Sequence, residues 1–273
     1  MVVLTNAVGV VLYLFVGLFR VEFTWFSFAW ALAMAVIMIP YYMIGIKVLS
    51  LGSLAIYSMF MMLGGMLVPF FYGILFLNEE VTLCKILGSI LLTLFIIFQA
   101  FSQQPSNAKD TETVQAGTQR KTKWLFFILC LVIFFLNGMT GVIAKAHQIG
   151  SNPINEVSFT IISCAISALM GLVWLTFHMM TGDKKVKFSE LNAALKWKPF
   201  FAMVLMGAAA YTGNFLHLKA ANKVPASVQF PLVSGGVIVL SSLVSAFIFR
   251  EKLSKKEWIS VLGAFIATVL FAF

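Results

Sequence analysis

The chain has 273 residues, of which 61% are hydrophobic and only 11% are charged, and its formal net charge is +9. A soluble domain has roughly 25% charged residues, so this composition indicates an integral membrane protein and leaves little room for a soluble domain. The positive charge does not indicate nucleic-acid binding, because the basic residues lie in short loops between apolar runs, where they normally set membrane orientation.

The apolar runs predict nine membrane-spanning helices, because a backbone in hydrocarbon must satisfy its own hydrogen bonds. The predicted spans are 2–19, 25–46, 54–77, 85–101, 124–145, 157–179, 199–218, 225–249 and 257–273. The polar segment 102–123 is predicted to link two halves of the chain. A second polar loop, Thr181–Lys198, contains Phe188 and Trp197, whose amphipathic rings suit a membrane interface.

The chain contains an internal repeat. Shifted by 172 residues (219 minus 47), Lys47–Phe101 lies over Lys219–Phe273 without a gap, and Gly64 coincides with Gly236. Identity between the two stretches is low. The prediction depends on the shared order of charged ends, apolar runs and lengths, which is typical of transporters.

The repeat predicts how the chain is organised. We expect a first copy of four helices over 1–101 and a second copy of five over 124–273. Span 124–145 has no partner, because its counterpart would lie upstream of Met1; a misassigned start, a fragment and a genuine nine-helix form all explain this. The predicted fold is therefore an all-α membrane protein with nine transmembrane helices from an inverted five-helix repeat, whose first helix is absent from the first copy.

The loops predict an orientation. Those after spans 25–46, 85–101, 157–179 and 225–249 share one side of the membrane and hold most of the 19 Lys and Arg residues. The positive-inside rule places these loops in the cytoplasm and the C-terminus outside.

No pattern for catalysis or metal binding occurs in the sequence. All carboxylates lie outside the deep parts of the apolar runs, which removes the commonest proton relay and the commonest site for an organic cation. HExxH, GxSxG and Walker patterns are missing. Cys84, Cys130 and Cys164 have no CxxC spacing and are read as small apolar fillers. We expect no enzyme activity, no cofactor and no metal.

Two helix interruptions occupy matching places in the repeat. Span 199–218 contains the polar stretch Tyr211–His217, and the matching place in span 25–46 is Pro40-Tyr41-Tyr42. Interruptions at equivalent places of two halves point to a binding site at the membrane midplane. The alternative is a packed bend whose polar groups satisfy one another.

The polar and aromatic residues of these and neighbouring spans form the predicted site. The predicted cavity residues are Tyr41, Tyr42, Tyr57, Asn137, Tyr211, Asn214, His217 and Gln229. The residues predicted to allow helix movement are Pro40, Gly64, Gly65, Gly213, Gly235 and Gly236. Lys47 and Lys219 could contact an anionic substrate, or their ammonium groups could reach to the membrane surface.

Each copy also carries a characteristic order of residues: a basic residue at a helix end, a proline, an acidic turn and a small residue. The first copy has Lys47, Pro69, Glu79 and Gly88, and the second has Lys219, Pro231, Glu251 and Ser260. This order resembles the EamA family of the drug/metabolite transporter superfamily, most clearly over 29–101 and 200–273. The resemblance implies a ten-helix inverted-repeat transporter of small metabolites. It also implies a central cavity lined by the third and fourth helices of each half.

These observations predict a secondary transporter that works by alternating access in the cell membrane. Its substrate is expected to be a small neutral, zwitterionic or anionic metabolite, such as an amino-acid-like or aromatic one. The expected partners are this substrate and the lipid bilayer, without nucleic acid, and the chain could form a homodimer. The alternative is a non-transporting or fragmentary membrane scaffold that needs a partner chain.

Overall fold

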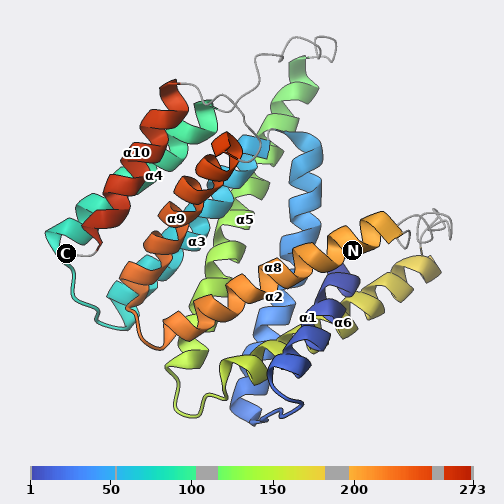
Figure 1. Cartoon of the computed structure of the whole chain (residues 1–273). Coiled ribbons are helices and arrows are strands. Elements are labelled where there is room, and N and C mark those ends of the chain that lie inside the picture. Colours follow the sequence, from blue (N-terminus) through green and yellow to red (C-terminus); the bar gives the residue numbers. More distant parts are fainter. Residues whose placement is uncertain (1, 53, 103–115, 182–196, 248–254, 272–273) are drawn as a thin grey trace. The chain divides into compact units, whose positions relative to one another are not determined.

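The computed structural model describes residues 2–52, 54–102, 116–181, 197–247 and 255–271. All regular secondary structure within these ranges is helical, in nine helices (Figure 1). They are α1 (Val2–Val16), α2 (Trp25–Leu51), α3 (Leu54–Phe76), α4 (Leu83–Ser102), α5 (Ala116–Gln148), α6 (Glu156–Thr181), α8 (Trp197–Ala221), α9 (Ala226–Phe247) and α10 (Lys255–Leu270). Each predicted span overlaps one of these helices.

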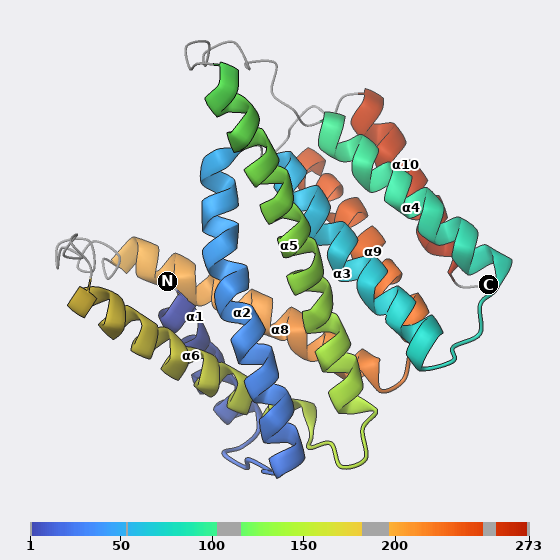
Figure 2. The ribbon, with the colours of Figure 1, turned by 180° about the vertical axis from the view of Figure 1, so that it is seen from behind.

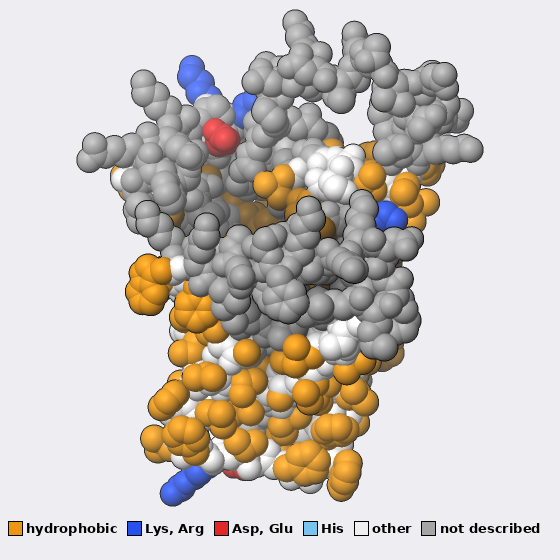
Figure 3. Space-filling model, turned by 90° about the vertical axis from the view of Figure 1, so that its right-hand side faces the viewer, with side chains coloured by type: hydrophobic (Ala, Val, Ile, Leu, Met, Phe, Trp, Pro, Cys, Tyr) orange, Lys and Arg blue, Asp and Glu red, His pale blue; other side chains and the backbone are white. Residues whose placement is uncertain are grey.

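Six of the described helices contain a segment long and apolar enough to cross a bilayer. The segments are Trp25–Leu51, Ile56–Phe76, Leu83–Ala100, Trp124–Gln148, Glu156–Val173 and Ala226–Val244. Many large hydrophobic side chains are exposed, and Figure 3 shows a face on which they cover most of the surface not drawn in grey. So large an apolar surface needs lipid around it, which confirms the predicted all-helical membrane protein. The nine spans of an inverted repeat remain a prediction.

The first helix ends earlier than the sequence predicts. α1 ends at Val16, whereas the predicted span runs over 2–19. Leu18 and Phe19 have φ angles of 50° and 59°. These angles lie in the left-handed region, which bulky residues rarely adopt and in which an α-helix cannot continue.

The predicted polar linker is shorter in the structure, because a helix begins inside it. α5 begins at Ala116, inside the predicted linker 102–123. Most of the predicted loop Thr181–Lys198, with Phe188, lies outside the described residues. Trp197 begins α8 and is exposed, as expected of a ring at the membrane interface.

The helices form two compact units, which are described separately. The first unit comprises Met1–Tyr42 and Ile143–Lys223, and the second comprises Met43–Val142 and Val224–Phe273. α2 and α5 therefore each contribute to both units. Each unit draws on both predicted copies of the repeat, 1–101 and 124–273, so the compact units are not the copies themselves.

In the first unit, α1 packs against α6 and α8, and α6 also contacts α8 (Figure 2). The N-terminal part of α2 and the end of α5 complete its core. The buried core residues are Ala31, Ala144, Ile154, Phe159 and Leu218. Apolar burial does not drive helices together inside lipid, so close packing must do so, and the small Ala31 and Ala144 side chains permit it.

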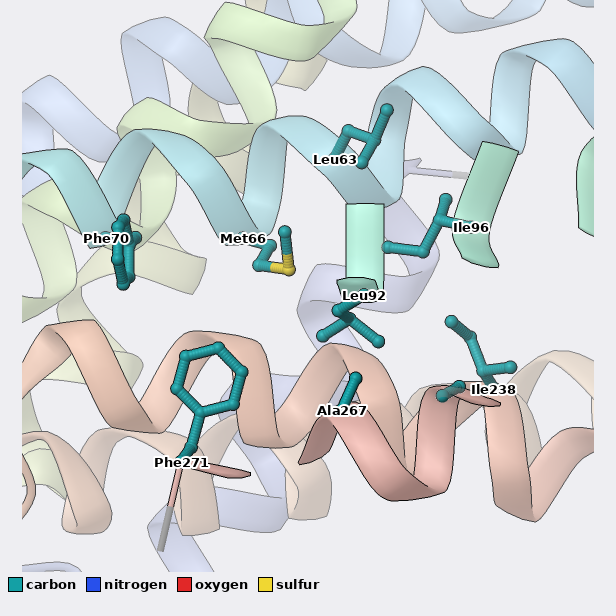
Figure 4. Close-up of a cluster of buried hydrophobic side chains, with 9 residues drawn as sticks. Leu63, Met66, Phe70, Leu92, Ile96, Ile238, Ala267 and Phe271 are labelled. Carbon is teal, nitrogen blue, oxygen red and sulfur yellow. The ribbon is translucent and has the colours of Figure 1, made fainter. Parts of the chain in front are cut away.

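In the second unit, α3 packs against α9 and α4 packs against α10, with further contacts of α3 with α4 and of α9 with α10. All four helices contribute side chains to one core (Figure 4). Its residues are Leu63, Met66, Phe70, Leu92, Ile96, Ile238, Ala264, Ala267 and Phe271. Alanines on α10 let the bulky side chains of α3 and α4 fill the space between the helices.

Candidate functional site

The residues predicted to line a cavity divide between the two units. Tyr41, Tyr42, Tyr211, Asn214 and His217 belong to the first unit, and Tyr57, Asn137 and Gln229 belong to the second. The contacts within each unit show which of these side chains have a packing role and which are open.

Tyr211 is held in the interface between α8 and α1. Its hydroxyl donates a hydrogen bond to Asn6 Oδ1 at 2.7 Å, and the Tyr13 hydroxyl donates to the Tyr211 backbone carbonyl. The Tyr13 and Tyr211 rings meet edge to face, with centroids 5.9 Å apart. Gly9 makes room for this contact, because a Cβ there would lie 2.6 Å from the Tyr211 ring. Tyr211 thus fits the packed alternative, in which polar groups satisfy one another.

The next turn of α8 is more open. Asn214 is exposed and His217 is half-buried. A Cβ at Gly213 would meet no described atom within 4 Å. The Asn214 side chain, in the predicted polar stretch of α8, is therefore accessible and is not held in a packed contact like that of Tyr211.

The two lysines predicted as anion contacts are both exposed. Lys219 Nζ lies 5.6 Å from the centroid of the Phe215 ring, within range of a cation–π interaction. Lys47 lies near the end of α2, in the second unit. Its backbone carbonyl accepts a hydrogen bond from Ser50 Oγ. Both ammonium groups are accessible to an anion or to lipid headgroups.

Tyr41 and Tyr42 follow Pro40 within α2. Their rings meet edge to face, with centroids 5.5 Å apart. Tyr41 is half-buried and Tyr42 is exposed. The pair therefore presents aromatic surface directly after the residue that weakens the helix.

Asn137 of α5 ties that helix to α3 in the second unit. Its side-chain amide donates to the Met61 backbone carbonyl at 2.7 Å. A Cβ at Gly65 would lie 2.7 Å from the Asn137 amide nitrogen. This is an interhelical hydrogen bond of the kind that stabilises helix pairs in membranes, and it gives Asn137 a packing role.

Tyr57 and Gln229, which the repeat places at equivalent positions, differ in burial. Tyr57 is half-buried, and its hydroxyl oxygen would lie 3.0 Å from a Cβ at Gly45. Gln229 is buried in α9. A Cβ at Gly235 would overlap the Thr268 hydroxyl of α10, so Gly235 allows these two helices to approach closely.

Sequence reasoning missed a buried polar network in the first unit. α5 ends with Lys145, His147 and Gln148, all buried, directly after its apolar run. His147 Nε2 lies 2.9 Å from Ser27 Oγ of α2, and His147 Nδ1 lies 3.2 Å from the amide nitrogen of Gln148. In the sequence, the only signal was a polar cluster at the end of an apolar segment. The Ser27 partner of His147 lies 120 positions away, so the sequence did not show that the two residues meet.

The hydrogen bonds of this network fix the histidine tautomer. The Asn222 amide nitrogen donates to Gln148 Oε1 at 2.9 Å, so the Gln148 nitrogen donates to Nδ1 and the ring proton of His147 is on Nε2. Nε2 then donates to Ser27 Oγ. Phe159 stacks on the imidazole at 3.9 Å between centroids. His147 and Ser27 are completely buried, and their hydrogen bond joins the end of α5 to the start of α2.

Two charged side chains form hydrogen bonds with backbone groups at the ends of other helices. Lys145 Nζ donates to the Ala221 carbonyl at 2.6 Å, at the end of α8. Glu79 accepts hydrogen bonds from the Ala226 and Ser227 backbone N–H groups at 2.6 and 2.7 Å, at the start of α9. Each charge has the sign that complements the helix dipole.

Comparison with known proteins shows a recurring fold. No protein-family model and no curated protein matches the sequence. A solved structure, described as "Crystal structure of protein", is similar to this chain, with a TM-score of 0.69 and 12% sequence identity. The similarity covers 98% of this chain and 85% of that one. At this identity the likeness concerns the fold alone, so the EamA resemblance stays a prediction.

Proposed function

We propose that the chain is a secondary transporter that moves a small metabolite across the cell membrane by alternating access. The proposed architecture is an inverted repeat of the EamA type, with four membrane-spanning helices in the first copy and five in the second. The proposal depends on how the helices pair and on where the compact units are joined.

The pairing of helices is the observation that carries the proposal. The aligned repeat makes α3 the counterpart of α9 and α4 the counterpart of α10. The same order of helices, with a shorter loop after the first, makes α1 the counterpart of α6. In the structure each of these helices packs against its own counterpart. Two copies related by a two-fold axis would pack in this way, and transporters of this class have such axes in the membrane plane.

α2 and α5 each pass from one compact unit to the other, and the residues where they do so suit a movement of the units. α2 leaves the first unit at Tyr42, shortly after Pro40, and α5 leaves the second unit at Val142, next to Gly141. Proline lacks a backbone N–H, so Pro40 removes a helical hydrogen bond close to the joint. Alternating access requires bodies that move against each other on a few connections, and a weakened helix is a suitable connection.

The polar groups available favour a substrate without a net positive charge. Among the described residues, no aspartate or glutamate side chain is buried. A buried cation would therefore lack a described carboxylate partner. Within the first unit, Asn214 and the exposed Lys219 of α8 supply an amide and a positive charge, which suit a zwitterionic or anionic group. We therefore assign the substrate to neutral, zwitterionic or anionic metabolites, such as amino-acid-like or aromatic ones.

A thermal-shift screen in detergent tests this assignment. A ligand that binds only the folded protein raises the unfolding temperature as its concentration rises. We expect at least one amino-acid-like or aromatic metabolite to do so, and Asn214→Ala to reduce the shift without lowering the unfolding temperature of the free protein. Thr212→Ala is the matched control, because Thr212 is exposed on the same helix and its hydroxyl bonds only to the Ala208 carbonyl among the described contacts. An equal shift in wild type and Asn214→Ala would remove Asn214 from the site.

A further inference from the structure

A row of four hydrogen-bonded side chains runs from the core of the first unit to its surface. His147 Nδ1 accepts from the Gln148 amide nitrogen at 3.2 Å, and Gln148 Oε1 accepts from the Asn222 amide nitrogen at 2.9 Å. The same Asn222 nitrogen donates to Glu156 Oε1 at 3.0 Å. His147 and Gln148 are buried, Glu156 is half-buried and Asn222 is exposed. We call these four residues the His147–Glu156 network.

The network joins the ends of three helices within the first unit. His147 and Gln148 end α5, Glu156 begins α6, and Asn222 directly follows α8. At the inner end of the network, His147 Nε2 donates to Ser27 Oγ of α2. The direction of these hydrogen bonds therefore affects how the end of α8 is attached to its neighbours.

Every donor of the network has an acceptor only while His147 is neutral. A protonated imidazole carries N–H on both nitrogens, so Nδ1–H would face the NH₂ group of Gln148. The Gln148 amide can turn to present its oxygen, but its nitrogen then faces the nitrogen of Asn222. Asn222 can turn in the same way, and its oxygen then faces the Glu156 carboxylate, which has no proton to donate.

One hydrogen bond is therefore lost when His147 takes up a proton, and burial decides which one. An unpaired polar group in the core costs more free energy than one that water can solvate. The contact between Asn222 and Glu156 is the outermost in the network, and Asn222 is exposed. The two amides should therefore turn, and the hydrogen bond that breaks is the one between Asn222 and Glu156.

We propose that protonation of His147 detaches Asn222, at the end of α8, from Glu156, at the start of α6, and so makes the attachment of α8 sensitive to pH. Histidine is the side chain whose charge ordinarily changes between about pH 5 and pH 8. α8 also carries Asn214 and Lys219, so the network regulates the candidate site from the end of the helix that bears it. This consequence rests on the proposed function, whereas the switch itself does not.

Charged groups on the neighbouring elements act on the same proton. Lys145 of α5 opposes a second positive charge, and its ammonium group donates to a backbone carbonyl at the end of α8. Glu156 of α6 favours the proton. Glu22 also favours it; this residue lies before α2 and accepts a backbone N–H just before α6. α2 and α6 also stack the Phe26 and Phe159 rings on the imidazole, and the network residue after α8 is a neutral amide.

Hydrogen–deuterium exchange of the full chain in detergent tests the proposal, over a series from about pH 8 to about pH 4 that spans the titration of histidine. The readout is the last turn of α8, where the Lys223 N–H bonds to the Ala220 carbonyl. The wild-type rate is divided by the rate of His147→Gln at the same pH, which cancels the effect of pH on amide chemistry. We expect this ratio to rise at least about five-fold as the pH falls, because one hydrogen bond at the helix end is lost.

Two carboxylate variants separate the network from general electrostatics. Glu156→Gln should abolish the rise although His147 is intact, because an amide at position 156 can turn and donate to Asn222. Glu22→Gln removes a carboxylate at the same end of the unit but outside the network, and it should keep the rise. Wild type and Glu156→Gln can be compared directly at each pH, so the test stands even if His147→Gln does not fold.

Three results would overturn the proposal. They are a wild-type rate that does not rise relative to either network variant, a rise that persists in Glu156→Gln, and a rise that disappears in Glu22→Gln as well. The last result would assign the effect to the total charge at this end of the unit. Exchange is measured without substrate, so a chain that fails to transport leaves each result intact.

Discussion

Gly64 and Gly236 show how one residue type serves two different surroundings. The repeat gives them the same place, yet Gly64 lies under the α5 backbone and Gly236 lies in open space among the described atoms. A methyl group at the first position must displace main-chain atoms, which cannot move as a side chain can. At position 236 a methyl group would meet no described atom within 4 Å, so it would only remove the conformational freedom of glycine.

Alanine at the two positions should therefore have opposite effects on stability. Gly64→Ala is expected to destabilise the chain by about 1–3 kcal/mol, the usual cost of overpacking a close contact. Gly236→Ala should leave stability unchanged or raise it by up to about 1 kcal/mol, because alanine is the better helix former. Unfolding midpoints of both variants in the same detergent compare the two effects. Equal losses would mean that Gly236, like Gly64, lies against another backbone.

Ser27 is the acceptor that the buried His147 needs. Ser27→Ala removes it and leaves the Nε2–H of His147 without that partner, at an expected cost of about 1–3 kcal/mol in unfolding free energy. Ser50→Ala on the same helix is the control, since Ser50 is exposed and bonds to the Lys47 carbonyl within its own turn. Denaturation in detergent should separate the two variants, and identical midpoints would contradict the assigned network.

At the scale of helices, Glu79 fixes where α9 begins. It follows α3 in the chain and accepts two backbone N–H groups of α9, which a helix leaves unpaired at its start. Gly73 makes room for the carboxylate, because a Cβ there would lie 2.6 Å from Glu79 Oε2. The end of one helix and the start of its packing partner are thus linked by one charged side chain.

Neutralising this carboxylate should loosen the start of α9. Glu79→Gln is expected to cost about 1–2 kcal/mol, because it removes a charge at the positive end of a helix dipole and weakens two charge-assisted hydrogen bonds. Glu80→Gln, at the neighbouring exposed position, should cost nothing measurable. Hydrogen exchange of the Ala226 and Ser227 amides gives a local readout: faster exchange only in Glu79→Gln is expected. Unchanged exchange in both variants would contradict the capping role.

The sequence predicted helices well and their side-chain partners poorly. Every predicted span overlaps a helix, because long apolar runs in a membrane have no other regular structure. The packing of Tyr211 against α1 was not predictable, since its partner Asn6 lies 205 positions away. His147 was missed for the same reason: a polar residue at the end of an apolar run resembles a loop residue until its partners from other helices are known. Residues 248–254, with Glu251, lie outside the described part of the chain.

At the scale of the whole molecule, two compact units share two continuous helices. If α2 bends near Pro40 during transport, restoring its helical hydrogen bond should hinder the movement. Pro40→Ala is therefore expected to slow uptake several-fold while ligand-dependent thermal shifts persist. Pro231→Ala is the control, because Pro231 lies inside α9, wholly in the second unit. Uptake rates in proteoliposomes compare them, and equal slowing by both variants would refute a special role of the α2 joint.

Transport itself is the property on which the proposed function depends most. The decisive measurement is counterflow in proteoliposomes: vesicles are loaded with an excess of the metabolite found by thermal shift, and entry of the radiolabelled compound is followed. We expect transient accumulation of label in vesicles with the wild-type chain, a much smaller accumulation with Asn214→Ala, and none in empty vesicles. No accumulation above empty vesicles for any metabolite that binds would contradict alternating access and favour a scaffold that pairs with another membrane protein.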